Sequence, residues 1–203
     1  ELPSYPLTTC LVSKRALDSG DGPFDLVING HLFRVCCPGC EGAAKAKATE
    51  LRAAIERAVI SAERAHWPFK KCPVSGESYE KPESQPVELV HGTRYVKLCC
   101  SSCVDAFEYG PEIFMKEIDA AYIAEQLKGY PLKTCPISGK PLGEKTVDFL
   151  YGTTLVRLCC KGCKKSFDEN PKASLMKIQQ AWAKAHKEKA EAKRAERSSP
   201  EKD

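Results

Sequence analysis

The chain has 203 residues, of which 29% are charged, and a formal net charge of +4. This balance is too mild for the clustered basic face of a nucleic-acid-binding protein, and no apolar run approaches the roughly 18 residues of a membrane span. We therefore expect neither nucleic-acid binding nor a membrane span. The first residue is Glu1 rather than Met, which favours an exported protein, periplasmic or extracellular, whose signal peptide has been removed.

All 12 cysteines belong to a unit that the chain repeats three times, each with one upstream cysteine and a downstream Cys-Cys-x-x-Cys cluster. The sets are Cys10 with Cys36, Cys37 and Cys40; Cys72 with Cys99, Cys100 and Cys103; and Cys135 with Cys159, Cys160 and Cys163. They predict module 1 (1–62), module 2 (63–126), module 3 (127–186) and a charged, disordered tail (187–203). Modules of about 60 residues have a marginal core, so they need a metal or disulfides as a staple.

Each module is predicted to contain a β-hairpin between its upstream cysteine and its cluster. In module 1, Asn29-Gly30 separates two apolar-rich runs, which is the strongest short-range hairpin signal. Modules 2 and 3 place His91-Gly92 and Tyr151-Gly152 at this point. In all three modules the returning strand ends directly in the double cysteine, and the cluster then opens a helix.

Modules 2 and 3 share a further sequence frame. After the upstream cysteine, both continue as Pro, Val or Ile, Ser and Gly, which is typical of a tight turn that brings backbone N–H groups near a sulfur. After the cluster they share Phe107 to Pro111 and Phe167 to Pro171. The phenylalanine follows the last cysteine by one helical turn, so we expect it to pack under the site. The proline is expected to end the first helix and start a second, over about 112–128 and 172–189.

Module 1 is the degenerate member of the repeat. It keeps Ser13 but has Lys14 in place of the turn glycine. Ala44 replaces the phenylalanine, and no proline follows it. Because residues 43–65 are almost all strong helix formers, we expect one uninterrupted helix there. Its four cysteines are therefore expected to lie in a looser frame.

These patterns predict an α+β fold of three tandem small cysteine-rich modules, each a β-hairpin followed by helices. An aromatic-Pro-apolar triplet precedes each upstream cysteine, beginning at Tyr5, Trp67 and Tyr130. We interpret these triplets as core plugs beside each site. No nucleophile–base pair, Gly-rich phosphate loop or recurring pair of carboxylates indicates an enzyme.

Four thiols per module suit either one tetrahedral metal ion or two disulfides. In the metal interpretation, the Cys-x-x-Cys spacer turns two sulfurs toward one ion about 2.3 Å away, and the upstream cysteine adds a third. The second vicinal cysteine completes a closed site only if the strand bends, because neighbouring residues point to opposite sides of a strand. Two disulfides remain the alternative, with three possible connectivities. Thiol–disulfide exchange at a helix-start Cys-x-x-Cys is a third possibility.

Taken together, the Cys-Pro-(Val or Ile)-Ser-Gly turn, the hairpin glycine and Leu-Cys-Cys-x-x-Cys-x-x-x-Phe-x-x-x-Pro resemble the TRASH/YHS group of small metal-binding domains. Modules 2 and 3 resemble it over most of their length, and module 1 only from Cys10 to Cys40. The resemblance implies a compact treble-clef-like module that binds zinc, copper or another soft metal. It implies ligands at Cys36, Cys40, Cys99, Cys103, Cys159 and Cys163. The chain departs from the family at Ser13, Ser75 and Ser138, where the usual pattern has a cysteine.

We therefore expect non-catalytic binding of a soft transition metal, zinc or copper(I), by all twelve cysteines, with up to three ions per chain. The expected role is metal handling or structural stability. The alternative is a disulfide-stapled exported module that binds an unidentified protein partner. A thiol–disulfide oxidoreductase is the third interpretation.

Overall fold

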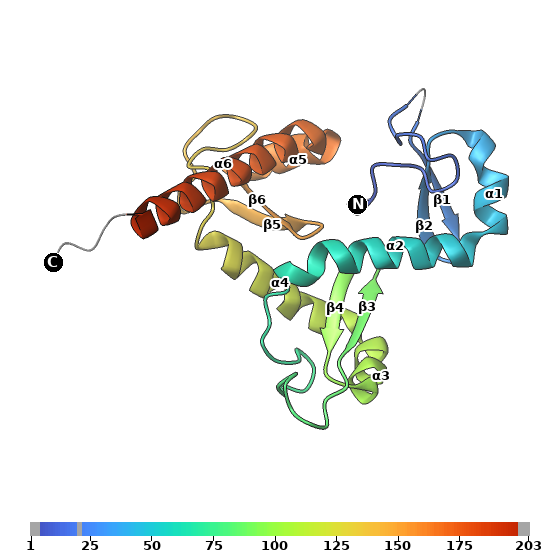
Figure 1. Ribbon diagram of the computed structural model, residues 1–203. Helices are drawn as coiled ribbons and strands as arrows, with labels where there is room; N and C mark the ends of the chain where they lie inside the picture. The colour runs from blue at the N-terminus through green and yellow to red at the C-terminus, as the bar shows by residue number, and fades with distance from the viewer. Residues whose placement is uncertain (1–4, 20–21, 199–203) are drawn as a thin grey trace. The chain divides into compact units, whose positions relative to one another are not determined.

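The computed structural model describes residues 5–19 and 22–198. Each module contains one two-stranded antiparallel hairpin followed by helices (Figure 1), which confirms the predicted α+β class. The chain forms two compact units, Glu1–Ala121, which contains the hairpins of modules 1 and 2, and Tyr122–Asp203, which contains the hairpin of module 3.

The three hairpins have the same length and register. Their strands are β1 (Phe24–Ile28) with β2 (His31–Val35), β3 (Val87–His91) with β4 (Arg94–Leu98), and β5 (Val147–Tyr151) with β6 (Thr154–Leu158). In module 1 the turn is Asn29-Gly30, as predicted, with φ of 51° and 76°. Positive φ at both positions is the pattern of a type I′ turn, which suits the twist of the flanking strands.

The predicted turns of modules 2 and 3 were wrong by one residue. The turns are Gly92-Thr93 and Gly152-Thr153, because His91 and Tyr151 are the last residues of their strands. Only the glycine has a positive φ, 63° in both modules. This is the pattern of a type II′ turn, which needs glycine at the first central position and accepts threonine at the second.

Each module continues into two consecutive helices. They are α1 (Glu41–Ala46) and α2 (Ala48–Glu63), α3 (Ser101–Tyr109) and α4 (Pro111–Leu127), and α5 (Lys161–Glu169) and α6 (Pro171–Ser198); short 3-10 helices η1 (Pro38–Cys40) and η2 (Arg64–His66) flank the first pair. As predicted, Pro111 and Pro171 start the second helices of modules 2 and 3.

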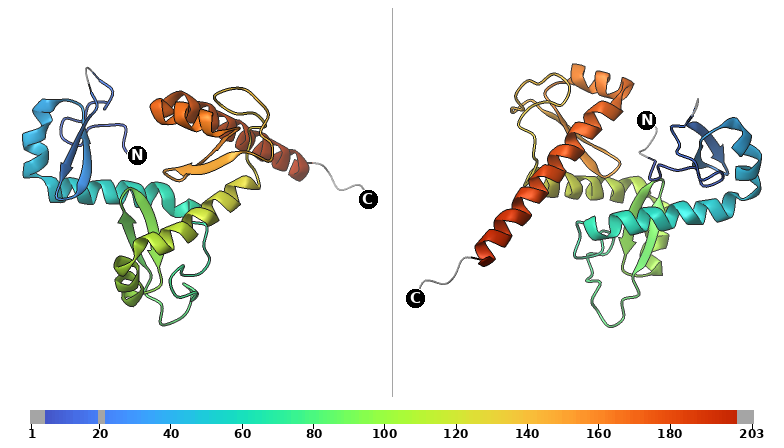
Figure 2. Two further views of the ribbon diagram at one scale, coloured as in Figure 1. Left: turned by 180° about the vertical axis from the view of Figure 1, so that it is seen from behind. Right: turned by 45° about the horizontal axis from the view of Figure 1, so that its top comes forward.

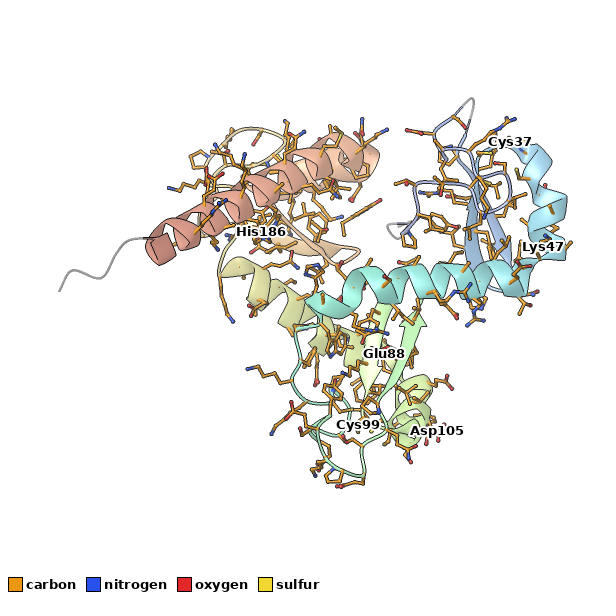
Figure 3. All side chains as sticks on the ribbon, in the orientation of Figure 1. Cys37, Lys47, Glu88, Cys99, Asp105 and His186 are labelled. Carbon is orange, nitrogen blue, oxygen red and sulfur yellow. The ribbon has the colours of Figure 1, made fainter. Side chains whose placement is uncertain are left out.

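The prediction of one uninterrupted helix in module 1 was wrong. The helix is interrupted at Lys47, which has φ −114° and ψ 21° and lies at the corner between α1 and α2 (Figure 3). The break lets Ala44 of α1 and Leu51 of α2 both become buried in one core. Packing on this core thus breaks a segment that intrinsic helix propensity alone would continue.

Helix α6 continues to Ser198, past the predicted end near residue 189 and through most of the segment assigned to the tail (Figure 2). Residues 199–203 lie outside the described ranges. Strong helix formers and the i,i+4 pairs Lys184–Glu188 and Lys187–Glu191, each at 3.9 Å, favour this extension. None of the helices in the described ranges is both long and apolar enough to cross a membrane.

Within the first unit, modules 1 and 2 share a hydrophobic core along α2. Leu51, Ile55 and Val59 of α2 are buried in one cluster with Phe33 and Val35 of module 1 and Tyr95 of β4 in module 2. The Trp67 ring packs edge-on against the Tyr95 ring, with centroids 5.4 Å apart. Its centroid is 5.2 Å from that of Phe69. The expectation that the aromatic triplets plug the core therefore holds for Trp67.

The helix that follows one hairpin also binds the next hairpin along the chain. Glu63 Oε2 accepts a hydrogen bond from the Tyr95 N–H at 3.0 Å. At the equivalent place, Gln126 Oε1 accepts the Leu155 N–H at 2.9 Å, and Gln126 Nε2 donates to the Thr153 carbonyl at 2.7 Å. Both strand residues are fully buried, so these side chains satisfy N–H groups that face away from the hairpin ladder.

Glu88 of β3 lies beside α2 (Figure 3) and connects its hairpin to Arg64, where α2 ends and η2 begins. It accepts hydrogen bonds from Arg64 Nε at 2.9 Å and from the Tyr95 hydroxyl at 2.6 Å. Burial raises the pKa of the Glu88 carboxyl, but the hydrogen bonds from Tyr95 and Arg64 outweigh it and lower that pKa. The folded protein therefore favours the ionised form of Glu88.

Candidate metal centre

The upstream cysteine starts a tight turn that is the same in all three modules. Its N–H donates to the carbonyl five residues later, and the N–H four residues later donates back to the cysteine carbonyl, at 2.8 to 2.9 Å. The fourth residue has a positive φ: 63° at Lys14, 73° at Gly76 and 71° at Gly139. Module 1 therefore keeps the turn even though Lys14 adopts a conformation that is unfavourable for a side-chain-bearing residue.

This turn directs hydrogen-bond donors at a buried sulfur. Burial raises the pKa of the Cys10 thiol, but the Ser13 hydroxyl and backbone N–H groups, chiefly those of Ser13 and Cys36, outweigh it and lower the pKa to about 6. The same opposition lowers the pKa to about 7 for Cys72 and to about 6 for Cys135. A thiol held in this way is ready to bind a metal as a thiolate.

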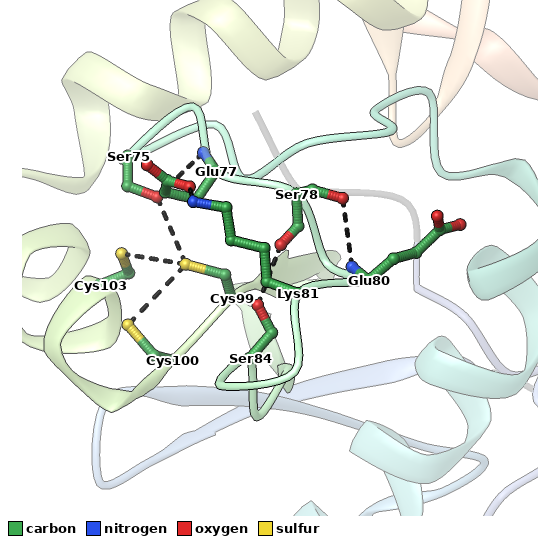
Figure 4. A network of polar contacts seen from close by, with 9 residues as sticks. All are labelled: Ser75, Glu77, Ser78, Glu80, Lys81, Ser84, Cys99, Cys100 and Cys103. Atoms are coloured by element: carbon green, nitrogen blue, oxygen red, sulfur yellow. Dashed lines mark hydrogen bonds and ion pairs between the residues drawn. The ribbon is translucent and has the colours of Figure 1, made fainter.

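The other three sulfurs come from the junction of the return strand and the helix. The first vicinal cysteine follows the strand, the second is the N-cap residue of the helix, and the last lies in its first turn. The chain bends at the vicinal pair, so that the Cys99 and Cys100 sulfurs are 3.8 Å apart (Figure 4). The separation is 3.9 Å for Cys159 and Cys160. The bend that a shared site requires is therefore present.

Three sulfurs in each module lie within 4.8 Å of one another. These triads, each formed by the upstream, first vicinal and last cysteines, are Cys10, Cys36 and Cys40; Cys72, Cys99 and Cys103; and Cys135, Cys159 and Cys163. Eight of the nine triad residues are buried, and Cys159 is half-buried. The structure thus brings together residues that are far apart in the sequence, from both sides of each hairpin.

The separations within the triads fit a metal ion. The sulfurs of Cys36 and Cys40 are 3.9 Å apart, and those of Cys10 and Cys40 are 4.0 Å apart. The pairs Cys99–Cys103 and Cys159–Cys163 measure 3.6 and 3.7 Å. A tetrahedral ion with metal–sulfur bonds of about 2.3 Å has sulfur–sulfur edges of about 3.8 Å. A disulfide has sulfurs about 2.05 Å apart, and none of the twelve cysteines is joined to another at such a distance.

The second vicinal cysteines, Cys37, Cys100 and Cys160, lie at the edge of each triad and are not members of these mutually close groups. Cys37 Sγ is 3.6 Å from Cys40 Sγ, and Cys160 Sγ is 3.7 Å from Cys163 Sγ. Cys37 and Cys100 are half-buried, and Cys160 is exposed. Of the twelve predicted ligands, nine therefore form the triads and three stand at the solvent side, within reach of a fourth corner.

The last cysteine of each triad is the one that loses its proton least easily. Burial, followed by contacts with neighbouring thiols, raises the pKa of Cys40 to about 12. Burial is also the main cause that raises the pKa of Cys103 and Cys163 to about 12. Three crowded sulfurs repel one another as thiolates, and a bound cation reverses this balance.

Serine hydroxyls complete the surroundings of the triads, and the sequence analysis did not assign them to the site. Ser13 Oγ is 3.0 Å from Cys36 Sγ, Ser75 Oγ is 3.3 Å from Cys99 Sγ, and Ser138 Oγ is 3.2 Å from Cys159 Sγ. The Ser75 oxygen also accepts the Glu77 N–H at 3.3 Å (Figure 4). Its own proton is therefore available to the sulfur. The signal in the sequence was the recurrence of serine three residues after each upstream cysteine.

The phenylalanine of the shared frame is buried in modules 2 and 3, and in module 3 it packs with the site cysteines as predicted. Phe107 and Phe167 are each 1% exposed, and Phe167 belongs to one buried cluster with Cys135 and Cys163. His31 and His91, which stand beside the hairpin turns, belong to none of the sulfur groups in the described residues.

Compared with protein-family models, with curated proteins and with solved structures, the chain matches none of them.

Proposed function

We propose that the protein binds one soft transition metal ion, zinc or copper(I), in each of its three sulfur triads. The observation that carries this proposal is the threefold recurrence of three sulfurs within 4.8 Å of one another. Their separations match the edge of a metal–thiolate tetrahedron, and thiolates select zinc and copper(I) over magnesium, calcium or manganese. The resemblance of modules 2 and 3 to TRASH/YHS domains supports the same assignment.

The residues of each module have different roles in binding the ion. The upstream cysteine, whose pKa is lowered by the turn, supplies a thiolate. The first vicinal and last cysteines supply two more, and the serine hydroxyl donates to one of them. The N-cap cysteine is available as a fourth ligand, which would leave no open position for water. Such a closed site stabilises its module or stores and delivers the ion, and it does not catalyse hydrolysis.

The test is to purify the protein without reductant or chelator, and then to measure metal content and free thiols on one sample. We expect about three ions per chain. Thiol reagents should react slowly until a chelator removes the metal. A sample with neither metal nor free thiols would refute the proposal and indicate a disulfide scaffold instead. Insulin reduction by the wild-type chain that is lost in Cys160→Ser would instead support a thiol–disulfide oxidoreductase.

A further inference from the structure

The three candidate sites differ in how far solvent reaches their sulfurs. The triads of modules 1 and 2 are wholly buried, whereas in module 3 Cys159 is half-buried. The N-cap cysteine follows the same order, because Cys37 and Cys100 are half-buried and Cys160 is exposed. Two of the four sulfurs of module 3 therefore face solvent, and ligand exchange at a thiolate site requires such access.

The exposed Cys160 sulfur still lies against the triad. Its Sγ atom is 3.7 Å from Cys163 Sγ and 3.9 Å from Cys159 Sγ. These separations correspond to edges of a metal–sulfur tetrahedron, so Cys160 can occupy the fourth corner. Because it is the most exposed of the four sulfurs, it is also the one that an incoming ligand can replace.

Charge distinguishes the rim of module 3 from that of module 2. We define the rim as three positions: the residue two after the turn serine, the residue after the N-cap cysteine, and the residue four further along the helix. In module 3 these are Lys140, Lys161 and Lys165, all exposed. In module 2 they are Glu77, Ser101 and Asp105, also exposed.

Two of the three rim positions of module 3 adjoin the sulfurs along the backbone. The N–H of Lys140 is bonded to Ser138 Oγ, which contacts Cys159, and Lys161 directly follows Cys160. In module 2, Figure 4 shows Glu77 and Lys81 beside Ser75 and Cys99, and Asp105 lies on α3, two residues after Cys103 (Figure 3). An exposed sulfur in a module whose rim carries three exposed lysines favours the approach of an anionic ligand. In module 2, Glu77 is paired with Lys81 and Asp105 adds a negative charge, so that rim offers no such attraction.

We propose that module 3 is an exchange site, which passes its ion through Cys160 to an anionic thiol, while modules 1 and 2 retain their ions. This inference rests on the proposed metal binding. In the first step, the sulfur of the incoming thiolate forms a bond to the ion as the bond to Cys160 breaks, and Cys160 takes up a proton from solvent. Further thiolates then replace the three triad sulfurs in the same way, and the ion leaves the protein. The number of metal–sulfur bonds is unchanged, and no electron is transferred.

The experiment uses the full chain loaded with zinc and freed of unbound ion. It is challenged with 2-mercaptoethanesulfonate or with cysteamine, thiols of similar size and opposite charge, at matched thiolate concentrations. Zinc that remains on the protein is measured over time by elemental analysis after rapid gel filtration. We expect one of three ions to leave about tenfold faster than the others, and several-fold faster with the sulfonate than with the amine.

Two variants assign the fast ion to module 3. Cys160→Ser should speed the fast phase while three ions are still bound before the challenge, because the triad remains and water at the fourth corner is replaced more easily than a thiolate. An unchanged rate would overturn the role of Cys160. The matched variant Cys100→Ser changes the site of module 2, whose ion leaves slowly, so the rate of the fast phase should not change. The double variant Lys161→Glu, Lys165→Glu should remove the preference for the sulfonate. Charge reversal at Lys184 and Lys187 of α6 serves as its control and should leave that preference in place.

Three ions that leave at one common rate would overturn the exchange proposal and leave metal binding intact. Loss of the fast ion from freshly prepared Cys160→Ser would also overturn it, since Cys160 would then be a required resident ligand. An unchanged preference for the sulfonate in the double lysine variant would overturn the choice of an anionic acceptor. A wild-type chain that binds no zinc would overturn the proposed function itself and this inference with it.

Discussion

Lys14→Gly is expected to stabilise module 1, because the lysine holds a backbone conformation that suits glycine. Lys14 has φ 63°, close to the 73° and 71° of Gly76 and Gly139 at the equivalent positions. A left-handed conformation costs a side-chain-bearing residue about 1–2 kcal/mol. The greater entropy of the unfolded glycine backbone offsets about 0.5–1 kcal/mol of this gain. The net gain in the free energy of unfolding is therefore about 0.5–1 kcal/mol.

The assay is urea unfolding of the metal-loaded protein, followed by Trp67 fluorescence. The chain has two tryptophans, so a Trp182→Phe background leaves Trp67 as the single reporter. Trp67 packs against the core cluster that modules 1 and 2 share. Since the turn holds Cys10, the same gain should raise the affinity of the module 1 site for zinc about two- to fivefold.

Gly76→Lys in module 2 is the matched control. No atom lies within 4 Å of a Cβ placed on Gly76, so backbone strain is the only direct cost of the change. We expect a loss of about 0.5–1 kcal/mol in the free energy of unfolding. The reasoning fails if Lys14→Gly leaves stability unchanged or lowers it while Gly76→Lys is harmless.

Three further predictions concern the joint between modules, acid stability and the serine donor. Gln126→Ala should lower the free energy of unfolding by about 1–3 kcal/mol, because the buried Leu155 N–H loses its acceptor; urea melts of Gln126→Ala and of the exposed control Glu125→Ala measure this, and equal stability of the two would contradict it. The lowered pKa of Glu88 stabilises the fold above the ordinary carboxyl pKa of about 4.3, and this contribution is lost as pH falls through the folded-state value. The difference in free energy of unfolding between wild type and Glu88→Gln should therefore shrink as the pH falls. A difference that grows on acidification would refute a stabilising role for ionised Glu88. Ser75→Ala should weaken zinc binding in module 2 by about tenfold in a chelator competition, as loss of a donor to a metal ligand does; an unchanged affinity would remove the serine from the site.

Much of the fold could be predicted because its signals are local. Asn29-Gly30 specifies a turn, and Pro111 and Pro171 start helices for reasons contained in a few residues. The break at Lys47 could not be predicted in this way, because its cause is the burial of Ala44 and Leu51 in one core. Intrinsic propensity does not register such tertiary packing.

The residues of the candidate site could be predicted from the sequence. Which of them form the triad, and which lies at its solvent side, could not. Spacing showed that four cysteines recur together, but not that Cys160 and its equivalents would lie at the solvent edge of each triad. That division depends on the bend between strand and helix, which places the second vicinal cysteine at the N-cap. The roles of Glu63 and Gln126 were missed for a similar reason. Each acts on a strand of the next hairpin, some 30 residues away along the chain.

Native mass spectrometry of the chain, purified without chelator or reductant, tests the central claim most directly. One spectrum separates bound metal, which adds the mass of each ion less the protons it displaces, from disulfides, which remove two hydrogens each. The account predicts a main species with three zinc or copper ions, one for each triad, and no hydrogen loss beyond that displacement. A main species without metal that lacks the hydrogens of several disulfides would contradict it.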